Sequence, residues 1–561
     1  MKILGQDIRI EETKDKMQII RIMKDGKNIY IGSKYNMKQE LDNFLKNINN
    51  IKNNTILIVL GFGTGEHIKI LREHYSENSI FILEPNKSLK KYGESLEWIK
   101  QDDNVRIFNL DIQELTKYIN EFNVDNINIS VFANYSKIYL DELKVFFEEL
   151  KRYCINIKGN KTTKLLFSKL WFETLINNIP YIGQSIPSNV YKDAYKGKPA
   201  IIVSAGPSLE KNVEDLKGYE DNFLIFTGGR TFKGLIEKNI KPDLLAVLDP
   251  GDKLYKMVEG YIEKESIPLF FYEGTNPDVV KKHRGTKILS RYSHSYSDFI
   301  ERVTQMPIIQ GSGGGSVAHY MTLHAVFMGC NPVIFIGQDL AYGSDKKYSD
   351  FAKIKGESIE EVKSENDVYV EGVTESIVKS DIYLNAFRVE FENIIQRYPQ
   401  VKFINATEGG ARIHGTTEMC LKDALKIYKK DINKDVQPKY KINIEENIRK
   451  ELADIIIKCR AVKELLQRLL KILASTKNEN DEIINMEHKV DQYIQELELL
   501  KTLFYPIFYD ILSKKNNAFE ITGKNIEYSV EERGTIYKSI IEVIDYALPE
   551  IEKVLDRLSI K

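Results

Sequence analysis

The sequence IIVSAGPSLEKNVEDLKGY, residues 201–219, predicts a buried strand that turns sharply into a helix. The apolar run ends at Val203, and the next four residues are typical of a tight turn. Ser208 stands where the N-cap of a helix is expected. Three apolar residues at helical spacing then mark the buried face of the helix: Leu209, Val213 and Leu216. A strand joined to a helix in this way is the repeating unit of α/β folds.

The turn itself predicts a binding site for an anion. The first backbone N–H groups of a helix have no partner within the helix, and they are free to bind a phosphate. We therefore expect the backbone N–H groups at the start of this helix to form an anion pocket, to which the hydroxyls of Ser204 and Ser208 add donors. An ordinary capped strand–helix turn is the alternative interpretation.

Residues 198–430 repeat this strand–helix pattern, which indicates a parallel sheet. The predicted strands are AIIV, FLIFT, LLAVL, PLFFY, PIIQ, VIFIG and VKFIN. A charged segment, residues 345–367, interrupts the pattern, and we interpret it as a loop over the site or as an insertion.

Polar residues and glycines follow many of these strands. The ends of parallel strands share one edge of the sheet, where ligands of α/β proteins bind. At this edge we expect Thr227, Gly228, Gly229, Arg230, Asp249, Glu273, Gln338, Asp339, Asn405, Thr407 and Glu408. A glycine-rich turn that opens another helix is predicted to cradle an anion. Its members are Gly311, Ser312, Gly313, Gly314 and Ser316.

Residues 55–165 form an earlier α/β set with a glycine turn of its own. Gly61, Gly63 and Gly65 follow a predicted strand directly, and Glu84 ends the next one. Such glycines let the backbone approach a nucleotide, while the carboxylate can hold a ribose diol. The pattern resembles nucleotide-binding and S-adenosylmethionine-dependent methyltransferase domains. A Rossmann-like scaffold without a ligand stays open as the alternative.

From about residue 440 the apolar residues recur in steps of three and four, which predicts long packed helices. We therefore expect three domains. Residues 1–165 form a Rossmann-like domain, residues 166–435 a second α/β domain, and residues 436–561 an all-α domain. The C-terminal helices are a candidate surface for a homo-oligomer.

Composition narrows the classes of protein that are possible. The 561 residues include 80 Lys plus Arg and 81 Asp plus Glu, so the charge balance gives no indication of nucleic acid as a partner. The four cysteines lie far apart and form no CxxC pair, which argues against a zinc knuckle or a disulfide framework. We find no signal peptide and no apolar run long enough for a membrane span, and we expect a cytoplasmic protein. P-loop, zincin, α/β-hydrolase and kinase motifs are absent from the sequence.

Five segments, in order, resemble the motility accessory factor (Maf) family of flagellin glycosyltransferases: VSAGPSLEKN, KPDLLAVLDP, GSGGGSVA, IGQDLAY and NATEGGARI. The resemblance covers most of residues 165–430 and reaches the flanks only through their architecture. The central module is similar to archaeal hydroxymethylpterin diphosphokinases of the MptE-like type. Its GPSL turn is similar to that of bacterial CMP-sialic acid transferases. The resemblance thus implies a sialyltransferase-like α/β domain in the centre of the chain.

The resemblance also implies a reaction. A nonulosonic acid of the pseudaminic or legionaminic type is moved from its CMP-activated form to Ser or Thr of flagellin, before export. In the CMP-sialic acid transferases the turn holds the cytidine nucleotide, which points to Ser204, Gly206, Pro207 and Ser208. Relatives often carry a His shortly after the DLA stretch, whereas this chain reads AYGSDKKYSD. The identity of the catalytic base therefore stays open.

Transfer to a hydroxyl requires a base that accepts the hydroxyl proton. Asp339 is the first candidate, followed by Asp249 and His294. Tyr342 is placed to assist the departure of CMP, and Arg230 or the glycine-rich turn is placed to hold the sugar carboxylate.

Two other functions stay open at this point. Asp249 and Asp252 could bind Mg²⁺ on a diphosphate, as a hydroxymethylpterin diphosphokinase would require. A non-enzymatic assembly factor would instead hold flagellin through its helices, and its glycine loops would be relics.

Overall fold

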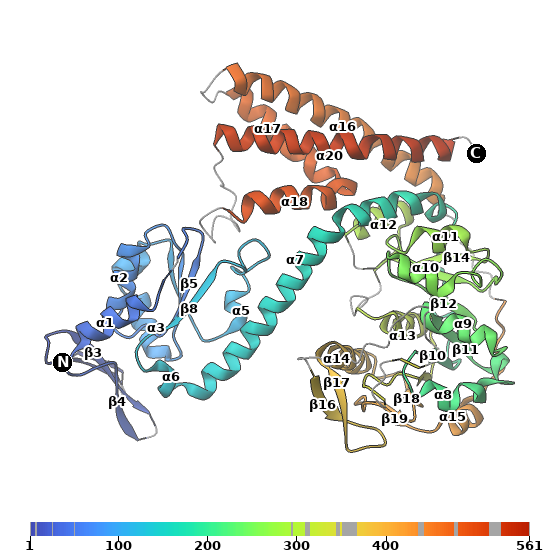
Figure 1. Cartoon of the computed structure of the whole chain (residues 1–561), viewed down its shortest axis with the longest axis horizontal. Helices are drawn as coiled ribbons and strands as arrows, with labels where there is room; N and C mark the ends of the chain where they lie inside the picture. Colours follow the sequence, from blue (N-terminus) through green and yellow to red (C-terminus); the bar gives the residue numbers. More distant parts are fainter. Residues whose placement is uncertain are drawn as a thin grey trace. The chain divides into compact units, whose positions relative to one another are not determined.

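The computed structural model describes residues 2–5, 8–24, 26–49, 51–292, 295–308, 315–343, 348–349, 367–435, 442–475, 481–514 and 529–559. The chain divides into two compact units (Figure 1). Unit 1 comprises Met1–Ser168 and Leu503–Ile540, and unit 2 comprises Lys169–Thr502 and Ile541–Lys561. The segment that we expected to form a separate third domain, residues 436–561, thus contributes helices to both units.

Unit 1 is built on a parallel sheet with the strand order β7-β6-β5-β8. The strands are β5 (Ile56–Leu60), β6 (Ile80–Leu83), β7 (Val105–Phe108) and β8 (Ile127–Val131). They coincide with the four strands that the sequence predicts in this region, and β5 and β6 are completely buried. The Rossmann-like character of this part of the chain is therefore confirmed.

Two further elements of unit 1 were not predicted. An antiparallel sheet precedes the parallel one and consists of β1 (Lys2–Gly5), β2 (Ile8–Glu12), β3 (Gln18–Lys24) and β4 (Lys27–Ile31). The end of helix α18 (Lys501–Leu512) joins this unit from far along the chain. Asn54 Nδ2 donates a hydrogen bond to the Ser513 carbonyl oxygen at 2.8 Å, and the rings of Phe122 and Tyr509 stack at 6.2 Å.

Unit 2 contains a nine-stranded sheet with the order β19-β18-β15-β10-β11-β12-β13-β14-β9, in which each neighbouring pair is parallel. The strands are β9 (Ile186–Pro187), β10 (Ala200–Val203), β11 (Leu224–Gly228), β12 (Leu244–Ala246), β13 (Leu269–Phe271), β14 (Lys287–Leu289), β15 (Val333–Ile336), β18 (Phe403–Asn405) and β19 (Thr417–Glu418). The chain winds from β10 towards β14, then returns to place β15 on the other side of β10. The sheet is therefore doubly wound.

Helices cover both faces of this sheet (Figure 1). On one face α13 (Val317–Phe327) and α14 (Ile382–Arg397) enclose a core with alternate strand residues such as Ile202 and Phe226. On the other face the covering helices are α8 (Leu209–Asn212), α9 (Gly229–Glu237) and α15 (Leu421–Tyr428). Ile201 and Ile225 point to that second core. Burial on both faces explains why these strands read as continuous apolar runs.

Some strand predictions in unit 2 were wrong or incomplete. Pro307 and Ile308, the first half of the predicted strand PIIQ, are not in a strand, and the second half lies outside the described residues. The sequence pattern missed β14, a three-residue strand that carries a lysine. It also missed an antiparallel hairpin, β16 (Asp367–Glu371) and β17 (Ile377–Asp381), which begins at the end of the charged interruption.

The helices after residue 440 confirm the predicted all-α character. They include α16 (Ile444–Ser475), α17 (Asp481–Glu496) and α20 (Val530–Ser559), and a much earlier helix, α7 (Leu140–Ile182), is also long. The predicted stripe on α16 is buried from Ile448 to Leu469. The sequence also predicts a helix from Ile483 that continues to Pro506. A 3-10 turn at Glu498–Leu500 instead divides this region into α17 and α18, and Pro506 lies inside α18.

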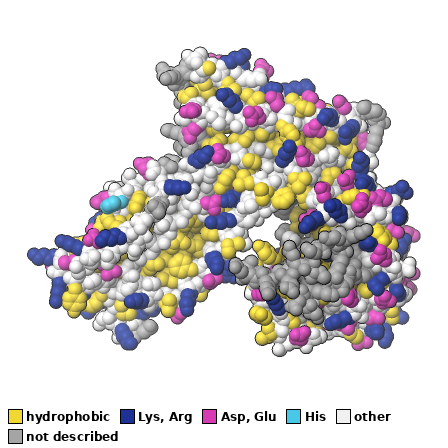
Figure 2. All heavy atoms as spheres, viewed as in Figure 1, with side chains coloured by type: hydrophobic (Ala, Val, Ile, Leu, Met, Phe, Trp, Pro, Cys, Tyr) yellow, Lys and Arg dark blue, Asp and Glu magenta, His cyan; other side chains and the backbone are white. Residues whose placement is uncertain are grey.

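Among the described helices, none combines the length and the apolar character that a membrane span requires. On the face drawn in Figure 2, basic and acidic side chains are interspersed. Several ion pairs among the described residues lie within one helix, such as Lys458 with Asp454 at 2.6 Å.

Candidate active site

The bend after β10 lies at the point where the strand order of the sheet reverses. Its neighbours are β15 on one side and β11 on the other. Ligands of doubly wound sheets bind at such a switch point, outside the carboxyl ends of the strands. Asp339 follows β15, and it meets Ser208 across this crevice. Two residues that are 131 positions apart in the sequence thus face each other at the expected edge.

Asp339 and Ser208 share a set of hydrogen bonds. The Ser208 hydroxyl donates to Asp339 Oδ2 at 2.7 Å, and the Ser208 backbone N–H donates to the same carboxylate at 3.2 and 3.3 Å. The Gly206 N–H donates to the carbonyl oxygen of Gly337 at 2.8 Å. The prediction that the amides of Gly206 and Ser208 are free for a phosphate is therefore wrong for this structure, because residues that follow β15 already accept their hydrogen bonds.

The helix after the bend is also shorter than predicted. Helix α8 contains four residues, and a 3-10 turn, Val213–Leu216, replaces its expected continuation. Ser208 occupies the N-cap position, but its side chain does not cap the helix. The hydroxyl is bound to Asp339 instead.

The Asp339 carboxylate is nearly inaccessible to solvent, with 5 % exposure. Burial raises its pKa to about 6, although the bonds from Ser208 and the charge of Lys211 act in the opposite direction. A pKa in this range suits a general base near neutral pH.

Glycines around Asp339 make room for it. A Cβ atom on Gly206 would lie 2.0 Å from Asp339 Oδ2. Gly410 has a φ of +71°, and a Cβ there would lie 2.3 Å from the Asp339 carbonyl oxygen. Any side chain at either position would displace the carboxylate or the strand end that carries it.

A cavity of about 440 Å³ opens beside Asp339. Pro207, Ser208, Asp339 and Tyr342 are the predicted site residues that line it. The other lining residues are Glu210, Lys211, Gly343, Thr374, Glu375, Ile377, Val378, Lys379, Gly409 and Gly410. Neither Lys211 nor the β16–β17 hairpin was predicted to be part of the site. Lys211 lies inside the quoted 201–219 stretch, whereas the hairpin carries no motif.

Tyr342 lines this cavity, but its hydroxyl serves another carboxylate. It donates to Asp381 Oδ2 at 2.6 Å, and Asp381 also caps helix α14 by accepting the N–H of Leu384. Burial and the bond to Asp381 raise the pKa of Tyr342 well above its ordinary value. In this arrangement Tyr342 anchors β17 and α14 beside the cavity.

Several predicted binding residues lie beneath the cavity and support it. The Ser204 hydroxyl donates to Gln338 Oε1 at 2.5 Å, and the Gln338 N–H donates to Thr407 Oγ1 at 3.2 Å. Asn405 Oδ1 accepts the N–H of Thr407 at 3.2 Å. Glu408 Oε1 accepts from Asn212 Nδ2 at 2.9 Å and from the N–H of Leu421 at 3.0 Å. These contacts fasten the ends of β10, β15 and β18 to one another.

The predicted site residues at the end of β11 and the start of α9 do not line this cavity. The Thr227 hydroxyl is buried and shares a hydrogen bond with the Thr231 hydroxyl at 2.7 Å. Gly229 allows α9 to approach its neighbour closely, since a Cβ would lie 3.2 Å from Leu254. A Cβ on Gly228 would lie 3.4 Å from Val317 at the start of α13. The Arg230 guanidinium lies 3.9 Å from the ring centre of Tyr348.

Asp249 and Glu273 do not line the cavity beside Asp339. Asp249 is exposed after β12, and Asp252 is exposed at the start of α10 (Asp252–Val258). Glu273 is fully buried after β13, and this burial raises its pKa to about 8. Within the part of the chain that the structure describes, no group of three or more His, Cys, Asp or Glu side chains is arranged to hold a metal ion.

Several predicted site residues lie outside the described residues: His294, Gly311, Ser312, Gly313 and Gly314. Ser316 is described, and its hydroxyl accepts the N–H of Ala318 at 3.3 Å as the N-cap of α13.

The glycine loop of unit 1 is filled by the protein's own side chains. The Tyr135 hydroxyl donates to Glu84 Oε2 at 2.6 Å and accepts the N–H of Gly63 at 3.1 Å. The same Glu84 oxygen accepts the N–H of Phe62 at 2.8 Å. A Cβ on Gly61 would lie 2.3 Å from the Tyr135 ring. The Glu84 carboxylate and the Gly63 N–H, which were expected to bind a nucleotide, form hydrogen bonds with Tyr135 instead. This favours the interpretation of the loop as a scaffold without a ligand.

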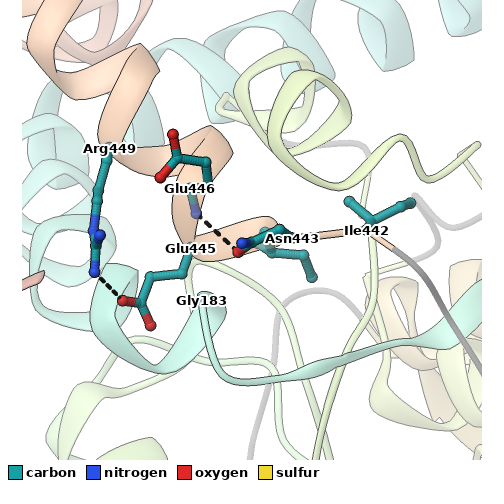
Figure 3. A pocket seen from close by; sticks show the side chains of 7 residues that line it. Gly183, Ile442, Asn443, Glu445, Glu446 and Arg449 are labelled. Atoms are coloured by element: carbon teal, nitrogen blue, oxygen red, sulfur yellow. Dashed lines mark hydrogen bonds and ion pairs between the residues drawn. The ribbon is translucent and has the colours of Figure 1, made fainter. Parts of the chain in front are cut away.

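A second cavity, of about 560 Å³, lies at the start of α16 (Figure 3). Two of the charged side chains that line it form an ion pair: Arg449 Nη2 lies 2.5 Å from Glu445 Oε1. The N–H of Glu446 donates to Asn443 Oδ1 at 3.1 Å. None of the predicted site residues lines this cavity.

The doubly wound sheet and the crevice beside Asp339 define unit 2 as an α/β domain of the ligand-binding type. Residues 173–345 match the family model described as 6-hydroxymethylpterin diphosphokinase MptE-like. The chain is 30% identical over 117 residues to the 6-hydroxymethyl-7,8-dihydropterin pyrophosphokinase of Methanocaldococcus jannaschii, which covers 19% of this chain and 46% of that protein. It is 27% identical over 128 residues to an uncharacterized protein of Treponema pallidum, covering 21% of this chain and 60% of that protein. The matches thus span about half the length of these relatives.

A solved structure is similar over nearly the whole chain. It is the Maf glycosyltransferase from Magnetospirillum magneticum AMB-1, with a TM-score of 0.58 and 15% sequence identity, covering 99% of this chain and 95% of that one. The chain therefore has the fold of that Maf glycosyltransferase, and residues 173–345 within it match the MptE-like family model. This confirms, at the level of the fold, the resemblance that the five motifs indicate.

Proposed function

We propose that this chain is a glycosyltransferase that moves a nonulosonic acid from a CMP-activated donor to Ser or Thr of flagellin in the cytoplasm. The observation that carries the proposal is the buried Asp339 carboxylate, which faces a cavity at the switch point of the sheet. The similarity of the fold to a Maf glycosyltransferase supports this class of reaction. The pseudaminic or legionaminic type of sugar and the flagellin acceptor rest on the motif resemblance.

In the proposed reaction the acceptor hydroxyl oxygen forms a bond to the anomeric carbon of the sugar. The bond from that carbon to the phosphate oxygen breaks, and its electron pair leaves with CMP. Asp339 accepts the proton of the hydroxyl as the new bond forms. The hydrogen bonds from Ser208 fix the orientation of the carboxylate and stabilise its ionised form.

The test is the intact mass of flagellin that is co-expressed with the chain and with a pathway for a CMP-nonulosonate. Wild type should add the mass of the sugar to flagellin, and Asp339→Asn should add none. Because Asn has nearly the same shape, Asp339→Asn should keep the thermal shift that CMP gives with wild type. An equal adduct with Asp339→Asn would remove Asp339 as the base.

The family match favours a second candidate, a Mg²⁺-dependent hydroxymethylpterin diphosphokinase. Asp249 and Asp252 would then supply two of the oxygen ligands that Mg²⁺ takes, and phosphate oxygens and water would supply the others. Thermal shift separates the candidates. Stabilisation by ATP with Mg²⁺ and not by CMP would favour the kinase, and stabilisation by CMP the transferase.

A further inference from the structure

Lys211 stands out among the charged residues of the cavity beside Asp339. The residues that line the cavity include three acidic residues, Glu210, Asp339 and Glu375, and two lysines, Lys211 and Lys379. Lys379 is paired with Asp367 at 2.8 Å. Among the described residues, the hydrogen-bond partner of the Lys211 ammonium group is the neutral carbonyl oxygen of Glu408, at 3.2 Å. Its positive charge is therefore not neutralised by a carboxylate of the described residues.

Lys211, Ser208 and Asp339 converge on one point. A Cβ built on Gly409 would lie 3.4 Å from Ser208 Cβ, 3.5 Å from Lys211 Nζ and 3.8 Å from Asp339 Oδ1. The glycine leaves the space between these three side chains open. Lys211 is close enough for its charge to act on Asp339, although it does not form an ion pair with it.

A phosphate needs a cationic partner here, because the amides expected to bind it are engaged. The N–H groups of Gly206 and Ser208 are bonded to Gly337 and Asp339. An anion beside an ionised Asp339 is repelled unless a positive charge lies between them. Lys211 is the cavity residue in position to provide that charge.

We infer that Lys211 binds the phosphate group of the nucleotide-sugar donor and of the nucleotide that leaves. This inference rests on the proposed transferase function. The phosphate gains a negative charge when the bond to the sugar breaks and the electron pair stays on its oxygen. The ammonium group therefore attracts the departing nucleotide more strongly than the intact donor, which favours the transfer step.

The experiment is calorimetric titration of the full chain with CMP and with cytidine, which lacks the phosphate. Lys211→Met removes the charge and keeps most of the volume of the side chain. We expect it to weaken CMP binding by roughly 10- to 100-fold, the range for a lost hydrogen bond to a charged group, and to leave cytidine binding unchanged. Lys211→Arg should retain most of the CMP affinity, because it keeps the charge.

The matched control is Lys217→Met. Lys217 is an exposed lysine of the same segment, it pairs with Glu214 at 3.2 Å, and it does not line the cavity. The Lys217→Met variant should bind CMP with the same affinity as wild type. If Lys211→Met binds CMP as tightly as wild type does, the inference about Lys211 is overturned and the proposed function is not affected. Failure of wild type to bind CMP would overturn the proposed function and this inference with it.

Discussion

At the scale of the residue, the pair Asp339 and Ser208 decides how the site responds to pH. The base works in its ionised form, and burial raises the pKa of Asp339 to about 6. We expect kcat/KM for transfer to rise with pH through about 6 and then to level off, because the carboxylate is protonated below this value and ionised above it. The measurement is kcat/KM against pH with a CMP-sugar donor. A midpoint near 4, the ordinary value of an exposed aspartate, would contradict the expectation.

Ser208→Ala tests the cause of this behaviour. The Ser208 hydroxyl donates to the carboxylate and so favours its ionised form. Its removal should move the midpoint upward by roughly one pH unit, since a hydrogen bond of this kind contributes about 1–2 kcal/mol. Ser204→Ala is the control, because the Ser204 hydroxyl bonds to Gln338 and should leave the midpoint in place. Identical pH profiles for Ser208→Ala and wild type would show that the hydroxyl does not tune the base.

At the scale of the element, the glycine loop after β5 is a packing device for Tyr135. Gly61→Ala would force a Cβ to 2.3 Å from the Tyr135 ring at a φ of +98°. We expect a loss of roughly 2–4 kcal/mol in the local stability of the sheet in unit 1, from overpacking and backbone strain together. Hydrogen exchange of the β5 and β6 amides measures this loss.

Gly159→Ala is the opposite case and serves as the control. Gly159 lies inside the long helix α7, and a Cβ there would meet no atom within 4 Å. Alanine should stabilise this helix by about 0.5–1 kcal/mol, because glycine loses more conformational freedom on folding. Equal effects of the two substitutions would show that Tyr135 does not fill the loop tightly.

Elements with a strong pattern could be predicted, and short or polar ones could not. β5 and β10 are continuous apolar runs beside glycine turns, so their position followed from the sequence. β14 has three residues, one of them a lysine, and β17 reads IVKSD, which lacks the alternation of polar and apolar residues that is typical of a strand. The sequence placed Asp339 at the sheet edge. The sequence did not show that Ser208 donates a hydrogen bond to the Asp339 carboxylate, because this contact links residues 131 positions apart.

At the scale of the whole molecule, the last helix completes unit 2. Residues of α20 after Ile540 bury a row of apolar side chains: Ile544, Ala547, Ile551, Val554 and Leu558. Glu552 pairs with Arg460 of α16 at 2.7 Å. A chain that ends at Ile540 should lose the protection of the α16 amides against hydrogen exchange, because each lost Ile, Val or Leu side chain contributes roughly 1.5–3 kcal/mol. A chain that ends at Ser559 is the control, and equal α16 protection in both chains would show that α20 is dispensable for unit 2.

The division of the chain into two units has a consequence for its synthesis. Unit 1 takes residues from the beginning of the chain and again from Leu503–Ile540. The ribosome therefore releases the Rossmann-like sheet long before the segment that packs on Asn54 and Phe122 has been made. Because domains tend to fold as they emerge, the nascent unit 1 must wait with that surface uncovered while more than three hundred further residues are translated. Apolar surface that is exposed during this interval is prone to aggregation.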